Sequence, residues 1–555
     1  MDLLDENDLP LKNRVDSKGY YQPAKVKGDS PALIPSEPLE AGEQYRFHFD
    51  MTRCIGCQCC VVACNEQNNN PAEVNWRRVG DIEGGTYPNT KRYHLSMACN
   101  HCLDPSCLEG CPTDAYVKLA NGVVKHQAEE CIGCGYCSWN CPYGVPQFNA
   151  DRRIVTKCDM CHSRLAEGQL PACIAACPES AIQIEKVNVA AWRKDHQAAD
   201  APHLPDSSMT ISTTRITLPE NMPEEIFRGN RHRIEPENPH TSLIFMTVLT
   251  QLAVGGFMTL WFFEFFSRWI GFLKPLQDFI PYGALGMLMV TGLALFAAVF
   301  HLGRPLHAYK ALRMWKRSWL SREVLLFALF SKAGGLYAVL QLARHFFSLK
   351  IPGSLMFVLG AFVVALGLGG VYASAKIYLV PARPAWNTVR TPLRFFLTGF
   401  ILGPLFALAV FSLYLVLSSS GLTTPGIKGP FFTFLAVSAM AGFFQMSVLL
   451  SRLFSLQGIQ SDELYASSVL LIHRFKKVFL ARLALLVLGS FLFPFILFAA
   501  LQAGTVSGAG LVALTLLCFI FSTAGEFLGR YLFFVTVVPK NIPGSFFTSQ
   551  QGGHG

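Results

Sequence analysis

Cysteines are the residues of this chain whose type and spacing most clearly indicate chemistry. Of the 18 cysteines, only Cys518 lies outside the stretch from Cys54 to Cys177. All but Cys59 and Cys518 fall into four groups of four. The groups are Cys54, Cys57, Cys60 and Cys64; Cys99, Cys102, Cys107 and Cys111; Cys131, Cys134, Cys137 and Cys141; and Cys158, Cys161, Cys173 and Cys177. Such crowding indicates metal binding or disulfides rather than ordinary buried cysteine.

The spacing within the groups favours iron–sulfur clusters. The first and third groups have the run C-x2-C-x2-C-x3-C, and a proline follows the third. In this arrangement three thiolates of one loop hold a cluster, and the fourth cysteine ligates the other cluster of a pair. The sixteen grouped cysteines therefore predict four [4Fe–4S] clusters. Because such clusters move single electrons, we expect this domain to conduct electrons between two other redox sites.

Zinc and disulfides are the alternatives to this interpretation. Zinc would use pairs of CxxC and leave half of each ferredoxin run idle, and disulfides do not form readily within such tight runs. Cys59 is left over, and we expect it to be a spare packed thiol. Nearby basic residues could tune the cluster potentials by charge, although such residues are more often simply solvated; they are Lys118, Lys125, Lys157, His101 and His162.

The surrounding chain divides into a polar half and an apolar half. Hydrophobic residues make up 51% of the sequence, and the excess is concentrated after residue 240. We expect a polar arm over residues 1–44, a cluster domain over 45–187, a Pro/Ser/Thr-rich linker over 188–240, a membrane domain over 241–540 and a polar tail over 541–555. The first residues show no export signal, so we expect no export of the chain on its own. The net charge of +9 does not indicate nucleic acid, because much of it flanks apolar segments.

Apolar stretches of about 20 residues, the length that a bilayer requires, recur through the second half. Charged residues, Gly or Pro separate them, and a soluble core would rarely repeat this pattern. We predict eight membrane helices, at Ser242–Phe265, Phe279–His301, Val324–Leu342, Gly353–Tyr378, Phe395–Leu417, Pro430–Leu450, Val478–Leu501 and Gly510–Val537. The predicted fold is thus an α+β ferredoxin-like double domain with four cubane clusters, followed by an all-α eight-helix transmembrane bundle.

Charged residues within membrane segments are costly and therefore suggest function. His301 and Arg304 end the second segment, and Glu323 opens the third, where an acid suits the helix dipole. His301 as a helix cap and Glu323 as a helix-terminal charge are the structural alternatives. We interpret Glu526 and Arg530 as a structural pair four residues apart. We expect no haem, because the histidines after His240 lie at segment edges, in loops or in the tail.

The cysteine domain resembles the iron–sulfur subunits of the dimethyl sulfoxide reductase family of molybdenum enzymes. The resemblance extends through YRFHFDMTRCIGCQCCVVACNEQN and CPYGVPQFNADRRIVTKCDMC. It implies one cluster on Cys54, Cys57, Cys60 and Cys177, and a neighbouring cluster on Cys64, Cys158, Cys161 and Cys173. It implies a second pair on Cys99, Cys102, Cys107 and Cys141, and on Cys111, Cys131, Cys134 and Cys137.

The membrane half resembles the anchor subunit of the same family in the motifs HLGRP and SWLSRE. The resemblance implies a natural fusion of two subunits and a quinone site (menaquinone or ubiquinone) at His301, Arg304 and Glu323. It also implies a large partner subunit that alone carries the molybdopterin. The chain would pass electrons between that catalytic subunit and the quinone pool, in sulfite oxidation or in S- or N-oxide reduction. A passive tether without a quinone site, and the ion-pumping anchor of another respiratory complex, are the alternatives.

Basic residues predict how the chain lies in a bacterial or archaeal plasma membrane. With eight helices, both ends of the membrane domain lie on the side of the cysteine domain. Loops on that side carry more Lys and Arg than the opposite loops, and the positive side is normally cytoplasmic. We therefore expect the clusters to face the cytoplasm, as in the cytoplasmic sulfite-oxidising branch of the family.

Overall fold

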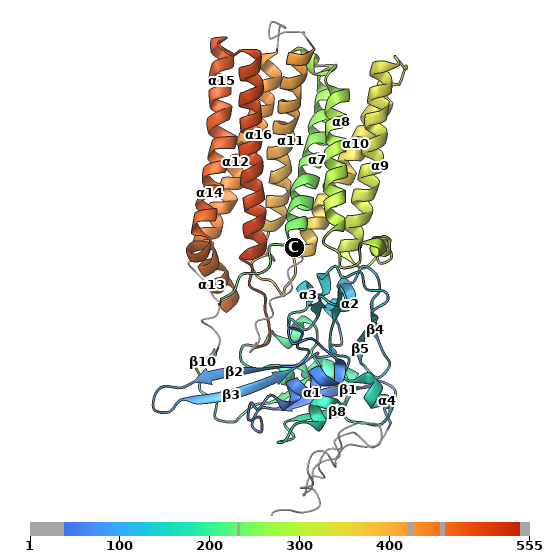
Figure 1. The fold of residues 1–555 in the computed structure, drawn as a ribbon, viewed down its shortest axis with the longest axis vertical. Helices are drawn as coiled ribbons and strands as arrows, with labels where there is room; N and C mark the ends of the chain where they lie inside the picture. The colour runs from blue at the N-terminus through green and yellow to red at the C-terminus, as the bar shows by residue number, and fades with distance from the viewer. Residues whose placement is uncertain (1–37, 230–233, 419–426, 456–460, 544–555) are drawn as a thin grey trace, which may run out of the picture.

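The computed structural model describes residues 38–229, 234–418, 427–455 and 461–543, apart from the side chains of 275 and 452–455. Figure 1 shows two regions: a small domain of short strands and helices, and a bundle of long helices that stands on it. The small domain precedes the bundle in the chain and lies against one end of it. The predicted arm and tail fall largely outside the described residues.

Short strands form the frame of the small domain. In one sheet, β1 (Glu43–Asp50) lies between β8 (Ile182–Asn188), to which it is antiparallel, and β9 (Arg215–Thr217), to which it is parallel. In a second sheet, β2 (Arg78–Gly84) lies between β10 and β3. Two hairpins complete the set of strands. The remaining strands are β3 (Lys91–Met97), β10 (Ile226–Arg228), β4 (Tyr116–Lys118) with β5 (Val124–His126), and β6 (Gln147–Asn149) with β7 (Ile154–Thr156).

Short helices carry or closely border the cysteines of this domain. All but the ten-residue α1 have only four or five residues. Left-handed glycines, such as Gly56 and Gly133, shape the cysteine loops. The helices are α1 (Cys59–Asn68), α2 (Ser106–Gly110), α3 (Tyr136–Asn140), α4 (His162–Ala166) and α5 (Ala172–Ala175). Together with the strands they make the ferredoxin-like region that the sequence predicts.

The segment after β8, for which the sequence predicts a linker over 188–240, folds against the cluster domain. It forms α6 (Val189–Asp195), two short 3₁₀ turns and the strands β9 and β10, which join both sheets. Trp192 is buried in this segment, and its indole donates a hydrogen bond to the Ser212 carbonyl at 2.8 Å. The segment up to β10 therefore packs as part of the domain. Its pairing partners lie far away in sequence, so local periodicity does not reveal them.

Eight helices in the described part of the chain are long and apolar enough to cross a membrane, as predicted. Most of them begin or end a few residues outside the predicted bounds, whereas α8 is shorter than predicted, α10 has the predicted bounds and α16 begins and ends two residues earlier. They are α7 (Thr241–Phe266), α8 (Ile280–Val299), α9 (Trp319–Phe346), α10 (Gly353–Tyr378), α11 (Arg390–Leu417), α12 (Lys428–Ser455), the continuous span of α14 (Lys476–Val487) and α15 (Phe493–Ala503) through a π-helical turn, and α16 (Gly508–Val535).

Glycine permits a close crossing of α7 and α11 in the middle of the bundle. A Cβ atom at Gly255 would overlap the backbone carbonyl of Gly399, and one at Gly403 would overlap the backbone of Gly255. Small residues of this kind let two membrane helices approach along their backbones, where packing rather than the hydrophobic effect holds them together.

The chain after α16 returns to the cluster domain, as the red segment below the bundle in Figure 1 shows. Ile542 is buried in the hydrophobic core of that domain. Asn541 accepts hydrogen bonds from Arg78 at its side chain (3.2 Å) and from Arg228 at its carbonyl (3.1 Å). Residues 541 and 542, expected to begin a polar tail, therefore pack into the first domain.

Candidate functional site

The structure gathers the grouped cysteines into four sets. We call Cys54, Cys57, Cys60 and Cys177 the distal set, because Cys57 is exposed at the surface. These four cysteines line one cavity, between the loop that precedes α1 and the turn that follows α5. Three come from one motif and the fourth from the far end of the cysteine region. Burial raises the pKa of the Cys60 thiol to about 11.

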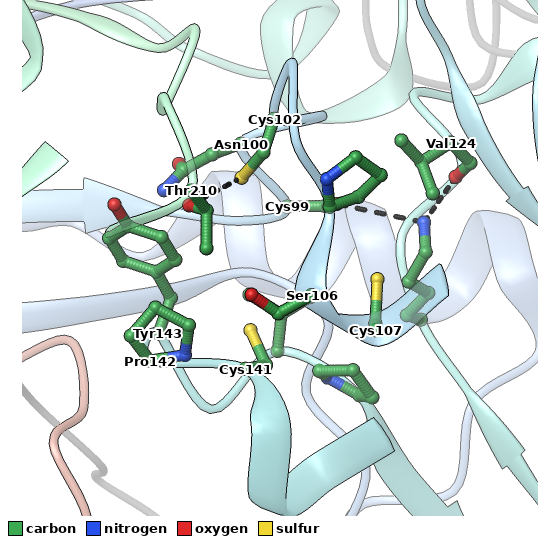
Figure 2. Close-up of a pocket in the computed structure, with 14 residues that line it drawn as sticks. Cys99, Asn100, Cys102, Ser106, Cys107, Val124, Cys141, Pro142, Tyr143 and Thr210 are labelled. Atoms are coloured by element: carbon green, nitrogen blue, oxygen red, sulfur yellow. Dashed lines mark hydrogen bonds between the residues drawn. The ribbon is translucent and has the colours of Figure 1, made fainter. Parts of the chain in front are cut away.

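Cys99, Cys102, Cys107 and Cys141 form another set, which we call the third set. These four line a second cavity, and Figure 2 shows their labelled side chains around it. Thr210 Oγ1 donates to Cys102 Sγ at 3.1 Å, and the His101 backbone N–H donates to Cys99 Sγ at 3.5 Å. Hydrogen bonds to sulfur of this kind tune the potential of a bound cluster.

Two further sets are recognisable from the charges that their thiols exert on one another. The second set comprises Cys64, Cys158, Cys161 and Cys173. Burial raises the pKa of Cys64, and the charges of Cys173 and Cys161 raise it further. Cys158 has Cys64 and Cys161 among its neighbours. We call Cys111, Cys131, Cys134 and Cys137 the proximal set, because the loops of the membrane domain contact it. Burial raises the pKa of Cys134, and the charges of Cys111 and Cys131 act in the same direction. Cys137 interacts with Cys134, Cys131 and Cys111.

The donor chemistry of these sets fits iron–sulfur clusters. Most of the thiols are buried, and burial alone would keep them neutral, as the raised pKa of Cys161, to about 11, shows. A coordinated metal reverses this preference, because its positive charge favours the thiolate. Four cysteine thiolates are the ligand set of a [4Fe–4S] cluster. Cys59, expected to be a packed thiol, is instead exposed beside Cys57, whereas Cys518 is buried in α16.

Two buried cations lie among the cysteine sets. Burial lowers the pKa of Arg77, but the charges of Cys173, Cys60, Cys158 and Cys64 outweigh burial and raise it. Burial likewise lowers the pKa of Lys157, and the charges of Cys99, Cys107 and Cys158 outweigh it. Lys157 is one of several basic residues that the sequence indicates, whereas nothing in the cysteine spacing indicates Arg77.

The loop that carries the HLGRP motif docks on the proximal set. Gly303 N–H donates to the Gly133 carbonyl at 3.3 Å, and Arg304 N–H donates to the Ile132 carbonyl at 3.0 Å. A Cβ atom at Gly303 would overlap the Arg153 carbonyl, so only glycine allows this approach. The Arg304 guanidinium donates to the Ala128 carbonyl at 2.9 Å. The second membrane helix is thereby joined directly to the loop between Cys131 and Cys134.

The SWLSRE motif makes a second contact with the proximal set. Ser318 Oγ donates to the Gly110 carbonyl at 2.7 Å and Ser321 Oγ to the Pro112 carbonyl at 3.3 Å, on either side of Cys111. The helix begins at Trp319, not at Glu323 as expected, because Ser318 has the extended conformation of an N-cap. Glu323 is therefore inside the first turns of α9.

Glu323 lies at the boundary between the bundle and the cluster domain. It is 4% exposed, and the Ser374 hydroxyl interacts with its carboxylate, but its Oε1 atom has no close hydrogen-bond partner among the described residues. Burial raises the pKa of the nearby Tyr136 phenol; a hydrogen bond with Asn140 opposes this rise, and the charge of Glu323 adds to it. Tyr136 stands between two cysteines of the proximal set, so Glu323 is close to that set. His301, beyond the end of α8, forms a short hydrogen bond with the Ala298 carbonyl.

An aromatic cluster that the sequence did not reveal joins the two domains. Trp139 of α3 enters the end of the bundle, where its ring lies 5.3 Å from that of His240, 5.6 Å from Tyr378, 5.4 Å from Trp386 and 6.4 Å from Phe534. The Trp386 indole donates to the Phe533 carbonyl at 2.8 Å. The sequence alone does not show whether a tryptophan inside a cysteine motif contacts another domain or packs within its own.

A buried polar cluster lies within the bundle, among α7, α11, α12, α14 and α16. Glu526 accepts hydrogen bonds from Thr398 (2.6 Å) and Gln445 (3.1 Å) and lies 4.0 Å from Arg482. Arg530 donates to Gln251 at 2.7 Å and lies 3.8 Å above the Phe395 ring. Glu526 and Arg530 thus make their direct contacts with residues of other helices, although their charges still interact.

Comparisons with known proteins give the same division of the chain. The family model for the DMSO reductase anchor subunit (DmsC) matches residues 237–535, and the model for a 4Fe-4S dicluster domain matches residues 90–187. A chain of the anaerobic dimethyl sulfoxide reductase of Haemophilus influenzae is 41% identical over 177 residues, which is 30% of this chain and 86% of the relative. A subunit of the sulfite dehydrogenase of Allochromatium vinosum is 38% identical over 160 residues, 25% of this chain and 67% of the relative. The formate dehydrogenase iron-sulfur subunit of Wolinella succinogenes is 39% identical over 166 residues, 26% of this chain and 82% of the relative.

The cysteine domain and the eight helices define a multi-pass membrane protein with an iron–sulfur electron-transfer domain. The chain belongs to the DMSO reductase anchor subunit (DmsC) family, and an iron–sulfur subunit of the same class of enzymes is fused to the N-terminal side of its anchor domain.

Proposed function

We propose that this chain passes electrons between a molybdopterin-binding catalytic subunit and the quinone pool, through four [4Fe–4S] clusters held by the sixteen grouped cysteines. The observation that carries the proposal is the order of the four sets. The distal set reaches the surface at Cys57, and the proximal set contacts the membrane motifs HLGRP and SWLSRE. The second and third sets lie between them, since Arg77 and Lys157 each interact with cysteines of two successive sets.

The chain's own residues would hold and insulate the clusters, whose chemistry when bound is to accept and donate single electrons. The four sets provide one thiolate for each iron. Backbone N–H groups, such as that of Gly133 toward Cys131 Sγ at 3.4 Å, would stabilise the negative charge on sulfur. The burial of most ligands would exclude water from all but the distal end of the path.

The quinone site would lie at the boundary of the domains, with His301, Arg304 and Glu323 as its polar residues. Quinol oxidation releases protons, and a carboxylate or an imidazole within reach can accept them. The unpartnered Oε1 of the buried Glu323 supports a ligand at this position, because buried polar atoms normally have partners. The Arg304 guanidinium already bonds the cluster domain, so its contribution would be to position the loop that carries His301.

The partner and the orientation belong to the same proposal. The relatives include subunits of a dimethyl sulfoxide reductase and of a sulfite dehydrogenase, which supports a large catalytic partner docked at the distal set. We place the cluster domain in the cytoplasm because of the excess of basic residues on that side. Some of these residues also pair with acids of the cluster domain, as Lys310 and Arg313 do with Glu130, and Arg317 with Asp114.

Anoxic purification of the tagged chain from its own membranes tests the proposal. Metal analysis should give about sixteen irons per chain, and mass spectrometry should identify a large co-purifying subunit that brings molybdenum or tungsten. The Cys60→Ser variant should lose iron, whereas Cys59→Ser, one residue away, should keep the wild-type content. Equal iron in both variants would contradict the ligand assignment. Abundant iron without a molybdenum or tungsten subunit would contradict the molybdenum-enzyme assignment.

A further inference from the structure

Arg77 occupies the junction between the distal and second sets. It precedes β2 and is 2% exposed. Its Nη1 atom donates to Ser96 Oγ at 3.1 Å, and Ser96 Oγ lies 3.4 Å from Cys60 Sγ of the distal set. Its charge also interacts with Cys64, Cys158 and Cys173 of the second set. One guanidinium therefore faces the sulfur atoms of two neighbouring sets.

Lys157 occupies the next junction, between the second and third sets. It follows β7 and is also 2% exposed. Its Nζ atom lies 3.6 Å from Cys99 Sγ of the third set and donates to the carbonyl of Cys158, a member of the second set, at 2.8 Å. It also donates to the Val124 carbonyl; dashed lines in Figure 2 reach Val124 and Cys99.

The last junction, between the third and proximal sets, contains a neutral residue instead. Tyr116 is 3% exposed, and the charges of Cys137, Cys107 and Cys131 act on its phenol, whose pKa burial already raises. The three junctions thus carry a guanidinium, an ammonium and a phenol in order from the surface to the membrane.

Neither buried cation has a carboxylate in contact with it. Among the described residues, no Asp or Glu oxygen lies within 4.0 Å of the side-chain nitrogens of Arg77 or Lys157, and Nε and Nη2 of Arg77 have no hydrogen-bond partner. A buried charge needs an opposite charge to offset its desolvation. The sulfur atoms are the main negative groups around both cations, and Asp159 raises the pKa of Lys157 less than the thiols do. A cluster with four thiolates is an anion that becomes more negative on reduction, so a fixed cation favours its reduced state.

We propose that Arg77 and Lys157 are positioning residues that each raise the reduction potentials of the two clusters they separate. The inference rests on the proposed function, because it requires the four clusters. The cluster of the second set faces both cations, and both raise its reduction potential. One cation raises the reduction potential of the cluster in the distal set, and the other raises that of the cluster in the third set. The cluster of the proximal set faces Tyr116, and neither cation raises its potential.

Redox titration of the purified chain, followed by electron paramagnetic resonance, tests this pattern without reference to turnover. Arg77→Met and Lys157→Met remove one charge each, whereas Arg77→Lys and Lys157→Arg retain it. Each neutral variant should lower two of the four midpoint potentials, with a change of about tenfold in the reduction equilibrium, or about 59 mV for a one-electron couple. One potential should fall in both variants, one in each variant alone, and one in neither. Lys125→Met, a change at a partly exposed neighbour of Val124, should leave all four potentials in place.

The outcomes separate this inference from the proposed function. Fewer than four clusters in the wild-type chain would overturn the proposed function and the inference with it. Four clusters in every variant, with potentials that do not move or that all move equally, would overturn the inference alone. If Lys157→Met fails to assemble, Lys157→Gln, which retains donors for the two carbonyls, provides the same comparison. Charge-retaining variants that shift as far as the neutral ones would also overturn it.

Discussion

At the scale of one residue, Glu323 is where the proposed quinone site can be tested most directly. The carboxylate is buried at the start of a membrane helix, beside Tyr136 of the cluster domain, and one of its oxygens lacks a hydrogen-bond partner among the described residues. A buried carboxylate without full internal hydrogen bonding is costly for stability. The proposed quinone site gives this carboxylate a role that offsets that cost.

Glu323→Gln should slow the reduction of the clusters by quinol by about 100-fold, the contribution of a positioned proton acceptor. Reduction by dithionite, which requires no quinone site, should remain unchanged. Stopped-flow absorbance of the clusters measures both rates. Glu264→Gln is a matched control, because Glu264 is a buried carboxylate of α7 that accepts a hydrogen bond from Tyr337 at 2.6 Å near the other end of the bundle. An unchanged quinol rate in Glu323→Gln would favour the passive tether.

The sequence indicated the cysteines and, among nearby basic residues, Lys157, but it indicated neither Arg77 nor the docking role of Trp139. Each cysteine motif has a fixed local spacing, because one loop supplies most of the ligands of one set. Arg77 and Trp139 have no such spacing, because their partners come from distant parts of the chain. Such residues are recognised only once the fold has placed their neighbours.

Among the elements, the contact between α7 and α11 depends most directly on single residues. The helices cross at Gly255, Gly399 and Gly403, where each backbone fills the space that a side chain would need. The crossing also supports Gln251 of α7, which lies one turn away and accepts the hydrogen bond of Arg530.

Gly255→Ala should lower the stability of the bundle by about 1–3 kcal/mol, the usual cost of overpacking. Gly292→Ala in α8, where an added Cβ would meet nothing within 4 Å, should be neutral or stabilising by up to about 1 kcal/mol, because alanine favours the helix. Thermal unfolding in a mild detergent compares the two. A Gly255→Ala protein as stable as Gly292→Ala would show that α7 and α11 do not need this close approach.

Elements differed in how far the sequence predicted them. The eight membrane helices follow from local hydropathy, because the bilayer imposes length and composition on each segment separately. The strands β9 and β10 could not be predicted from local sequence, since each is three residues long and pairs with a strand much earlier in the chain. The start of α9 was placed too late because the polar SWLSRE residues, which face the cluster domain, obscure the helix boundary.

For the whole molecule, the separation of the two domains makes the sidedness of the chain measurable. A protease site inserted at the exposed Tyr87 turn of the cluster domain should resist added protease in intact spheroplasts and be cut in inverted vesicles. A site inserted in the loop 347–352, between α9 and α10 at the far end of the bundle, should give the opposite result. Cleavage at Tyr87 in intact spheroplasts would place the clusters outside the cytoplasm and remove the charge-based orientation.

The return of the C-terminal segment has a consequence for how the protein is made. Ile542 and Asn541 complete the packing of a domain whose cysteines were synthesised before any of the membrane helices. Domains generally fold as units, from the N-terminus onward, during synthesis. The contacts of Ile542 and Asn541 therefore form only after the last membrane helix has been synthesised, so the cluster domain and its anchor depend on each other for a complete fold.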